Sequence, residues 1–183
     1  MKKLTLRAIA ETAALTALIC VLGPLSVPLP FSPAPIAFAN LAIFFAVYLL
    51  GTKRGVLCTA LYLLIGFVGV PVFAGFTGGA QKLLGPTGGY LVGYLPMALL
   101  IGLFVDRWCD SRPLATLPGY ILGCAACYAL GSVWMAKQLS LSFSAAMMMA
   151  VVPYLPGDAA KIALTLLAAP VVRRRLDKQR KSG

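Results

Sequence analysis

Hydrophobic residues fill six long stretches of the chain, and proline, glycine or charged residues separate one stretch from the next. This pattern predicts six helices, over residues 7–22, 36–50, 55–68, 90–105, 117–135 and 157–172. Each stretch approaches the length of about 20 apolar residues that crosses a bilayer as a helix. We therefore expect an all-α integral membrane protein, with one domain of six transmembrane helices over residues 1–183.

Three of the segments between these helices have an unusual composition. Residues 24–35 contain five prolines, residues 69–89 are rich in glycine, and Pro153 and Pro156 interrupt the chain before the last helix. Connections as long as residues 69–89 are usually functional lids or flexible linkers. Because this one carries apolar side chains such as Phe73, we expect a lid at the outer face. A re-entrant connection that packs on its own helices is the alternative.

Charged residues make up only 11% of the chain and hydrophobic residues 60%. This balance excludes an ordinary soluble enzyme and a nucleic-acid-binding protein, although the formal net charge is +11.

Loops on the cytoplasmic side of a membrane carry an excess of Lys and Arg. With the N-terminus inside, thirteen of the 16 basic residues lie on the inner side and only Lys82 and Lys137 lie outside. We therefore expect a multi-pass protein of the plasma membrane with both termini in the cytoplasm.

The chain lacks the residues that most enzyme chemistry requires. It has no histidine, only five acidic residues and no phosphate-binding motif of the form G-x-x-x-x-G-K-[ST], which excludes catalytic triads, imidazole metal sites and ATP binding. Cys124 and Cys127 have the spacing of redox cysteines but lie in a helical stretch, where we expect them to fill the core. We expect no enzyme activity, metal or cofactor. Uphill transport must then use a gradient or a partner.

Asp158 and Lys161 are the strongest candidates for ligand binding. A charge inside the bilayer costs about 2.5–3.5 kcal/mol on insertion scales, so such residues are rare and usually functional. Their spacing of three residues places both side chains on one face of the last helix. Asp can accept a hydrogen bond from a ligand N–H, and Lys can donate one to a carbonyl or carboxylate. The alternative is a pair that neutralises itself near the outer interface.

Further candidates lie near the outer ends of the predicted helices. Asn40 is the lone polar amide of its helix, and either a ligand contact or a bond between helices fits it. The remaining candidates come from the glycine-rich segment and from tyrosines near the outer boundary: Phe73, Gly75, Gln81, Tyr90 and Tyr154.

The first helix carries small residues at a spacing that lets helices approach closely in lipid. These residues are Ala10, Ala13, Ala14 and Ala17. They fit either internal packing or docking of another membrane protein. The missing ATP-binding motif favours docking, because a partner could then supply the energy.

Three motifs are specific: Gly69-Val-Pro-Val-Phe-Ala-Gly75, Gly85-Pro-Thr-Gly-Gly-Tyr-Leu91 and Pro156-Gly-Asp-Ala-Ala-Lys161. They resemble the biotin-specific substrate-binding (S) component of energy-coupling-factor (ECF) transporters, the BioY family. The stretches Ser32-Pro-Ala-Pro-Ile36 and Leu50-Gly-Thr-Lys-Arg-Gly55 fit as well. The chain departs from the family pattern at Ala37 and Ala39, where the family usually has Thr and Gln.

This resemblance implies a six-helix S-component bundle that captures biotin at the extracellular side. It also implies a complex with a transmembrane coupling (T) subunit and two ATPases. The family's biotin-binding Asp and Lys fall on Asp158 and Lys161, and its small-residue docking motif falls on the alanines of the first helix. The alternatives are an S component for a different small vitamin and a membrane scaffold subunit that binds no ligand. The scaffold alternative predicts a fully packed outer half.

Overall fold

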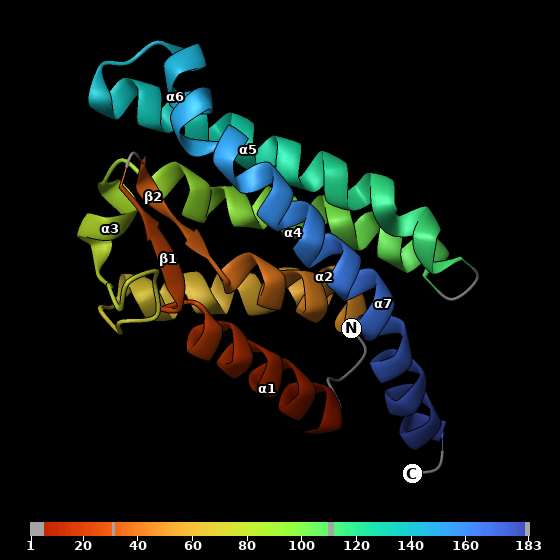
Figure 1. Ribbon diagram of the computed structural model, residues 1–183. Helices are drawn as coiled ribbons and strands as arrows, with labels where there is room; N and C mark the ends of the chain where they lie inside the picture. The colour runs from red at the N-terminus through yellow and green to blue at the C-terminus, as the bar shows by residue number, and fades with distance from the viewer. Residues whose placement is uncertain (1–5, 31, 110–111, 182–183) are drawn as a thin grey trace.

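The computed structural model describes residues 6–30, 32–109 and 112–181 and shows a bundle of long helices. These are α1 (Leu6–Leu22), α2 (Ala39–Phe67), α4 (Gly88–Trp108), α5 (Leu117–Leu139) and α7 (Leu155–Lys181). The shorter elements are β1 (Ser26–Leu29), β2 (Ser32–Ala37), α3 (Ala80–Leu84), α6 (Phe143–Ala150) and the 3₁₀ turns Pro113–Thr116 and Val152–Tyr154. The two strands, α3 and α6 lie toward one end of the bundle, and the start of α1 and the end of α7 lie toward the other (Figure 1).

Helix α2 contains a sharp turn at Gly51, whose φ of 78° and ψ of −178° are not helical. Residues eight positions apart in a straight helix are about 12 Å apart. A Cβ atom built on Gly55 would nevertheless lie 2.7 Å from the Cα atom of Val47. The segments on either side of Gly51 therefore run back against each other, which agrees with the predicted separation of residues 36–50 from residues 55–68.

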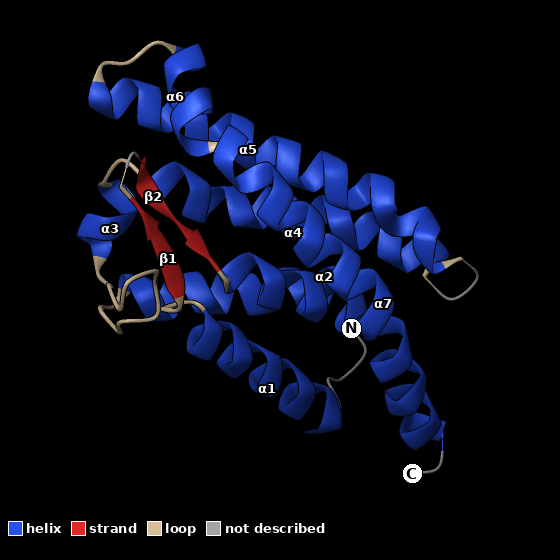
Figure 2. Ribbon diagram, in the orientation of Figure 1, coloured by secondary structure: helices blue, strands red, loops and turns tan. Residues whose placement is uncertain are grey.

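The proline-rich segment is a β-hairpin, so the expectation of an all-α chain is wrong here (Figure 2). Strands β1 and β2 are antiparallel, with Ser26 opposite Ala37 and Val27 opposite Ile36. Proline fixes φ near −65°, which suits an extended strand as well as a loop, and its missing N–H limits pairing to short edge strands. The hairpin also delays the next helix, which begins at Ala39 rather than at residue 36.

The end of the last helix and two short helices also differ from the sequence prediction. Helix α7 continues to Lys181, past residue 172 where the prediction ends it, because Arg and Lys are good helix formers and the charge does not break the backbone. The glycine-rich segment 69–89 contains the short helix α3, and helix α6 lies between the last two predicted helices. Both short helices lie at the end of the bundle that holds the hairpin (Figure 1).

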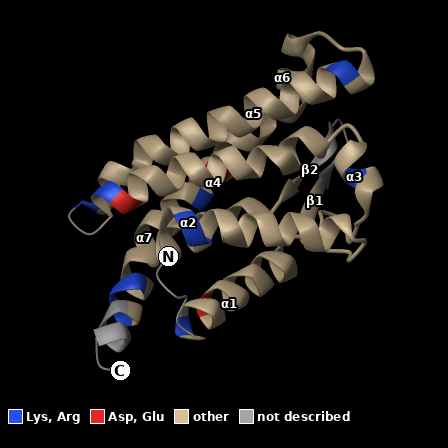
Figure 3. Cartoon of the chain, turned by 180° about the vertical axis from the view of Figure 1, so that it is seen from behind, with Lys and Arg blue, Asp and Glu red and all other residues tan. Residues whose placement is uncertain are grey.

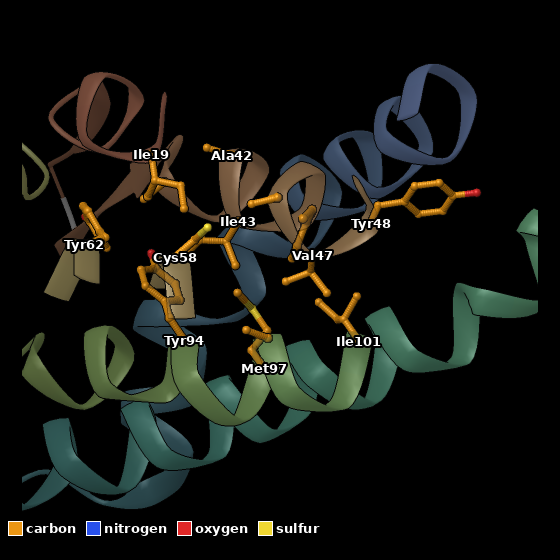
Figure 4. Packing of buried hydrophobic residues seen from close by; sticks show 14 of the residues in the cluster. Ile19, Ala42, Ile43, Val47, Tyr48, Cys58, Tyr62, Tyr94, Met97 and Ile101 are labelled. Carbon is orange, nitrogen blue, oxygen red and sulfur yellow. The ribbon is translucent and has the colours of Figure 1, made fainter. Parts of the chain in front are cut away.

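The core lies where α2 packs against α1, α4 and α7, and it continues to the contact between α4 and α5. Figure 4 shows Ile43 and Val47 of α2 facing Met97 and Ile101 of α4. These four side chains are almost completely buried. The outward faces also carry large apolar side chains, as Leu64, Leu103 and Leu167 show. A surface of this kind suits contact with lipid rather than with water.

Four helical segments of the described chain are long and apolar enough to cross a membrane. They are Ala39–Phe67, Gly88–Trp108, Pro113–Leu139 and Phe143–Leu176. The first of them contains the turn at Gly51 and so holds two antiparallel helices. Together with α1, the six predicted helices therefore correspond to α1, the two halves of α2, α4, α5 and α7.

Most of the described Lys and Arg residues lie at the end of the bundle where α1 begins and α7 ends (Figure 3). Arg54 of α2 donates to Glu11 of α1 over 2.9 Å at this end. Lys82 of α3 lies at the opposite end, where the hairpin is (Figure 3). Lys2 and Lys3, which contribute to the predicted inner charge, lie outside the described residues.

The substitution Gly51→Ala tests the turn in α2. Alanine is strained at a φ of 78°, and its Cβ would lie 2.4 Å from Oδ1 of Asp106. Strain of this kind costs about 1–3 kcal/mol, so we expect the thermal unfolding midpoint of the detergent-solubilised protein to fall by several degrees. Gly157→Ala is the matched control, because nothing lies within 4 Å of a Cβ at that position. Equal midpoints for the two variants would show that Gly51 does not constrain the turn.

Candidate functional site

Asp158 and Lys161 form a buried ion pair at the start of α7. Lys161 Nζ lies 2.9 Å from Asp158 Oδ1, and the two residues are only 7% and 8% exposed. Asp158 lies in the first turn of the helix, where the helix dipole stabilises a negative charge. Burial of a charge is costly unless it is paired and hydrogen-bonded, so the remaining polar atoms of the pair need partners.

Other elements of the bundle supply these partners. Asn40 of α2 donates from Nδ2 to Asp158 Oδ1 over 2.7 Å, and the hydroxyl of Tyr128 in α5 donates to Asp158 Oδ2. Lys161 Nζ also donates to Asn40 Oδ1 over 3.0 Å and to the carbonyl of Ala37, the last residue of β2, over 2.8 Å. We call Asn40, Tyr128, Asp158 and Lys161 the polar network.

Within the polar network, the carboxylate of Asp158 can accept a further hydrogen bond from a ligand. An ammonium group has three donors, and Lys161 directs hydrogen bonds to three acceptors. A carboxylate offers about four acceptor sites, and Asp158 accepts hydrogen bonds from three donors of the described chain, Asn40, Tyr128 and Lys161. The arrangement can therefore accept a hydrogen bond from a ligand at Asp158 while the pair stays intact.

A cavity lies beside the polar network and is bounded by all four of its residues. It offers about 90 Å³ to the centres of water-sized molecules, several times the roughly 10–15 Å³ that one buried water needs. Its walls are mostly apolar and aromatic, with Tyr62, Phe73, Tyr90, Tyr94 and Tyr154 among them. Small-molecule sites usually combine such walls with a few polar groups. The cavity contradicts the fully packed outer half that a scaffold subunit would have.

The glycine-rich segment 69–89 covers part of this cavity. Phe73 is fully buried, packs edge-to-face on Tyr62 at a centroid distance of 5.5 Å and lines the cavity. The segment is fastened to the bundle, because Gly75 N–H donates to the carbonyl of Pro24 over 2.9 Å and Trp134 Nε1 donates to that of Gly85 over 2.9 Å. The segment both packs on the helices and bounds the cavity, so the two readings of the sequence are compatible.

Six of the eight candidate binding residues line the cavity: Asn40, Phe73, Tyr90, Tyr154, Asp158 and Lys161. Gly75 and Gln81 do not line it, and both are exposed. The neighbour of Gln81, Lys82, lines the cavity instead. Asn40 forms a hydrogen bond with another helix and also borders the cavity. The bond between helices and the position for a ligand contact, which the sequence left as alternatives, are therefore both present.

Sequence reasoning did not find Tyr128 or the carbonyl of Ala37. Tyr128 follows Cys124 by four residues and Cys127 by one, and all three line the cavity, so the helical spacing of Cys124 and Tyr128 was an available signal. Both cysteines are buried and neither forms a disulfide within the described chain, as expected for residues that fill space. No sequence pattern identifies a backbone carbonyl as a lysine acceptor.

The small residues of α1 form an exposed face. Ala10, Ala13, Ala14 and Ala17 are all exposed, whereas Thr12, Thr16 and Ile19 of the same helix are buried against the bundle. The alanines therefore do not serve packing within the described chain.

The sequence matches the BioY family over residues 1–178. It is 36% identical over 164 residues to a biotin transporter BioY of Thermotoga maritima, across 90% of this chain and 94% of that protein. A biotin transporter BioY of Lactococcus lactis subsp. cremoris is 33% identical over 177 residues, across 92% and 89%. The crystal structure of an S-component for biotin from an ECF-type ABC transporter superposes with a TM-score of 0.86 at 30% identity, across 95% of this chain and 94% of that chain.

The ion pair predicts non-additive effects on stability. Asp158→Asn or Lys161→Met alone leaves one charge buried without its counter-ion, which typically costs about 3–5 kcal/mol. The double variant removes both charges, so its loss of stability should be well below the sum of the two single losses. Thermal unfolding of the solubilised protein without ligand measures all four forms. Strictly additive losses would mean that the two charges are not energetically coupled.

Proposed function

The chain belongs to the BioY family, and we propose that it is the S component that captures biotin at the extracellular face for an ECF transporter. One observation carries the proposal: the buried polar network borders a cavity with aromatic walls. The relatives named as biotin transporters and the solved S-component for biotin support the same ligand.

The chemistry of biotin suits this site. Its fused rings carry a ureido group, which offers two N–H donors and one carbonyl acceptor, on an otherwise apolar body. Asp158 has acceptor capacity for a ureido N–H, and Asn40 Nδ2 has a second N–H, besides the one it gives to Asp158, that can donate to a carbonyl. Lys161 can donate to the ligand by exchanging one of its three hydrogen bonds. The aromatic side chains Phe73, Tyr90 and Tyr154 offer apolar surface for the rings. The geometry thus supports Asp158, Lys161 and Asn40 as the residues that hold the polar end of the ligand.

We further propose that six helices cross the plasma membrane with both termini in the cytoplasm. The distribution of Lys and Arg supports this orientation, because basic side chains gather at the terminal end of the bundle (Figure 3). The cavity, the hairpin and the glycine-rich segment then face the exterior, where biotin arrives.

The chain has no phosphate-binding motif of its own with which to use ATP. We propose a complex with a transmembrane T subunit and two ATPases. The exposed alanine face of α1, formed by Ala10, Ala13, Ala14 and Ala17, supports α1 as the docking surface for the T subunit, because small residues let helices approach closely in lipid.

Binding of labelled biotin to the purified protein tests the proposed ligand. Asp158→Asn removes the charged acceptor and should weaken binding by roughly a hundredfold or more. Tyr128→Phe removes only one hydroxyl that donates to Asp158 and should weaken binding by about tenfold. Thiamin and riboflavin should not compete.

Tyr120→Phe is the matched control for Tyr128→Phe. Tyr120 lies on the same helix and is fully buried, and its hydroxyl has no hydrogen-bond partner within the described chain and does not border the cavity. Its removal should leave biotin affinity unchanged. A folded protein that ignores biotin but binds another vitamin would overturn the biotin assignment, and one that binds none would restore the scaffold alternative.

The docking surface makes a separate prediction. Enlarging two exposed alanines in Ala13→Leu/Ala17→Leu should prevent close approach of a partner helix, so the variant should lose co-purification with the T subunit and ATPases while it still binds biotin. Ala163→Leu, at an exposed position of α7, is the control and should co-purify normally. Undiminished assembly of the α1 variant would exclude this face as the docking surface.

A further inference from the structure

Lys82 is a second cation at the cavity, and the polar network does not include it. It lies in the last turn of α3, is partly buried and lines the same cavity as Asp158 and Lys161. Two hydrogen bonds hold this short helix in place, because Trp134 Nε1 donates to the carbonyl of Gly85 and Gln138 Nε2 to that of Leu84, each over 2.9 Å. The position of Lys82 at the cavity is therefore set by contacts with α5.

The described carboxylates are engaged away from Lys82. Glu11 pairs with Arg7 and Arg54, Asp158 pairs with Lys161, and Asp106 accepts from the backbone N–H of Thr52. None of the ion pairs within the described chain includes Lys82.

Asp110 and the side chain of Asp177 lie outside what the structure describes. Lys82 thus has no carboxylate partner among the acidic side chains that are described, Glu11, Asp106 and Asp158.

The charges bordering the cavity therefore sum to one positive charge. Lys161 balances Asp158, and Lys82 adds a cation without a counter-ion. Such a cavity favours a ligand that carries one negative charge and that also presents N–H groups to Asp158. A carboxylate is an acceptor that an ammonium binds through charge-assisted hydrogen bonds.

We propose that Lys82 is the carboxylate subsite of this cavity and binds the acid group of the ligand, while the polar network binds its opposite, uncharged end. The inference rests on the proposed function, because biotin carries its ureido group and its carboxylate at opposite ends. The ligand then bridges α7 and the glycine-rich segment 69–89, so the segment closes on the acid group and the protein selects the free acid over its neutral derivatives.

Binding of biotin and of its neutral primary amide, biotinamide, tests the proposal. The unmodified protein should bind biotin about tenfold more tightly than the amide, the factor expected for one charge-assisted hydrogen bond at a partly exposed position. Lys82→Met should reduce biotin affinity by about tenfold and leave amide affinity unchanged, so the preference disappears. Lys82→Arg keeps the charge and should keep the preference. Lys137→Met, at an exposed lysine that does not border the cavity, should behave as the unmodified protein.

The outcomes separate this inference from the proposed function. Equal affinities for the acid and the amide in the unmodified protein would overturn the subsite while leaving biotin capture in place. Loss of both ligands to the same extent in Lys82→Met would also overturn it, because the lysine would then act through the structure of the segment rather than through the acid. Failure of the unmodified protein to bind either ligand would instead overturn the proposed function.

Discussion

The buried pair of Asp158 and Lys161 is the constraint on which the rest of the outer half depends. Two charges that are almost fully removed from solvent are tolerated only if their remaining polar atoms are satisfied. The partners come from three other elements: Asn40 from α2, Tyr128 from α5 and the carbonyl of Ala37 from β2. The start of α7 is therefore fixed relative to two helices and the hairpin at once. The cavity lies where these elements meet. The hydrogen bonds that stabilise the buried pair therefore also hold the pair beside the cavity.

The same network is preorganised for a ligand of the proposed kind. The polar groups are already held by one another, so they lose little freedom when a ligand arrives, and such preorganisation lowers the cost of association. Asp158 keeps acceptor capacity beyond its hydrogen bonds with Asn40, Tyr128 and Lys161, so a ligand N–H adds an interaction rather than replacing one. The aromatic walls contribute burial of apolar surface, which stabilises the complex by roughly 25 cal/mol per Å².

The sequence predicted the helices better than it predicted the contacts between them. Apolar stretches set the long helices, and Gly51 with the basic residues after it indicated the turn in α2. The hairpin was missed because prolines suit strands and loops alike. Asp158 and Lys161 stood out as rare charges in an apolar helix. Tyr128 did not, because a tyrosine in an apolar stretch is common and its role depends on which helix lies opposite, and that is a property of the packing.

The position of α1 connects the proposed docking surface with the cavity. Its exposed alanines face away from the bundle, while its last turn leads directly to Gly23, where a Cβ would lie 2.3 Å from the carbonyl of Val72. The next residue, Pro24, accepts the hydrogen bond from Gly75. The C-terminal end of α1 therefore contacts the glycine-rich segment, and only a residue without a side chain permits this approach. Because Phe73 lies between these two contacts and lines the cavity, a partner that displaces α1 acts on the wall of the ligand site through a few backbone contacts.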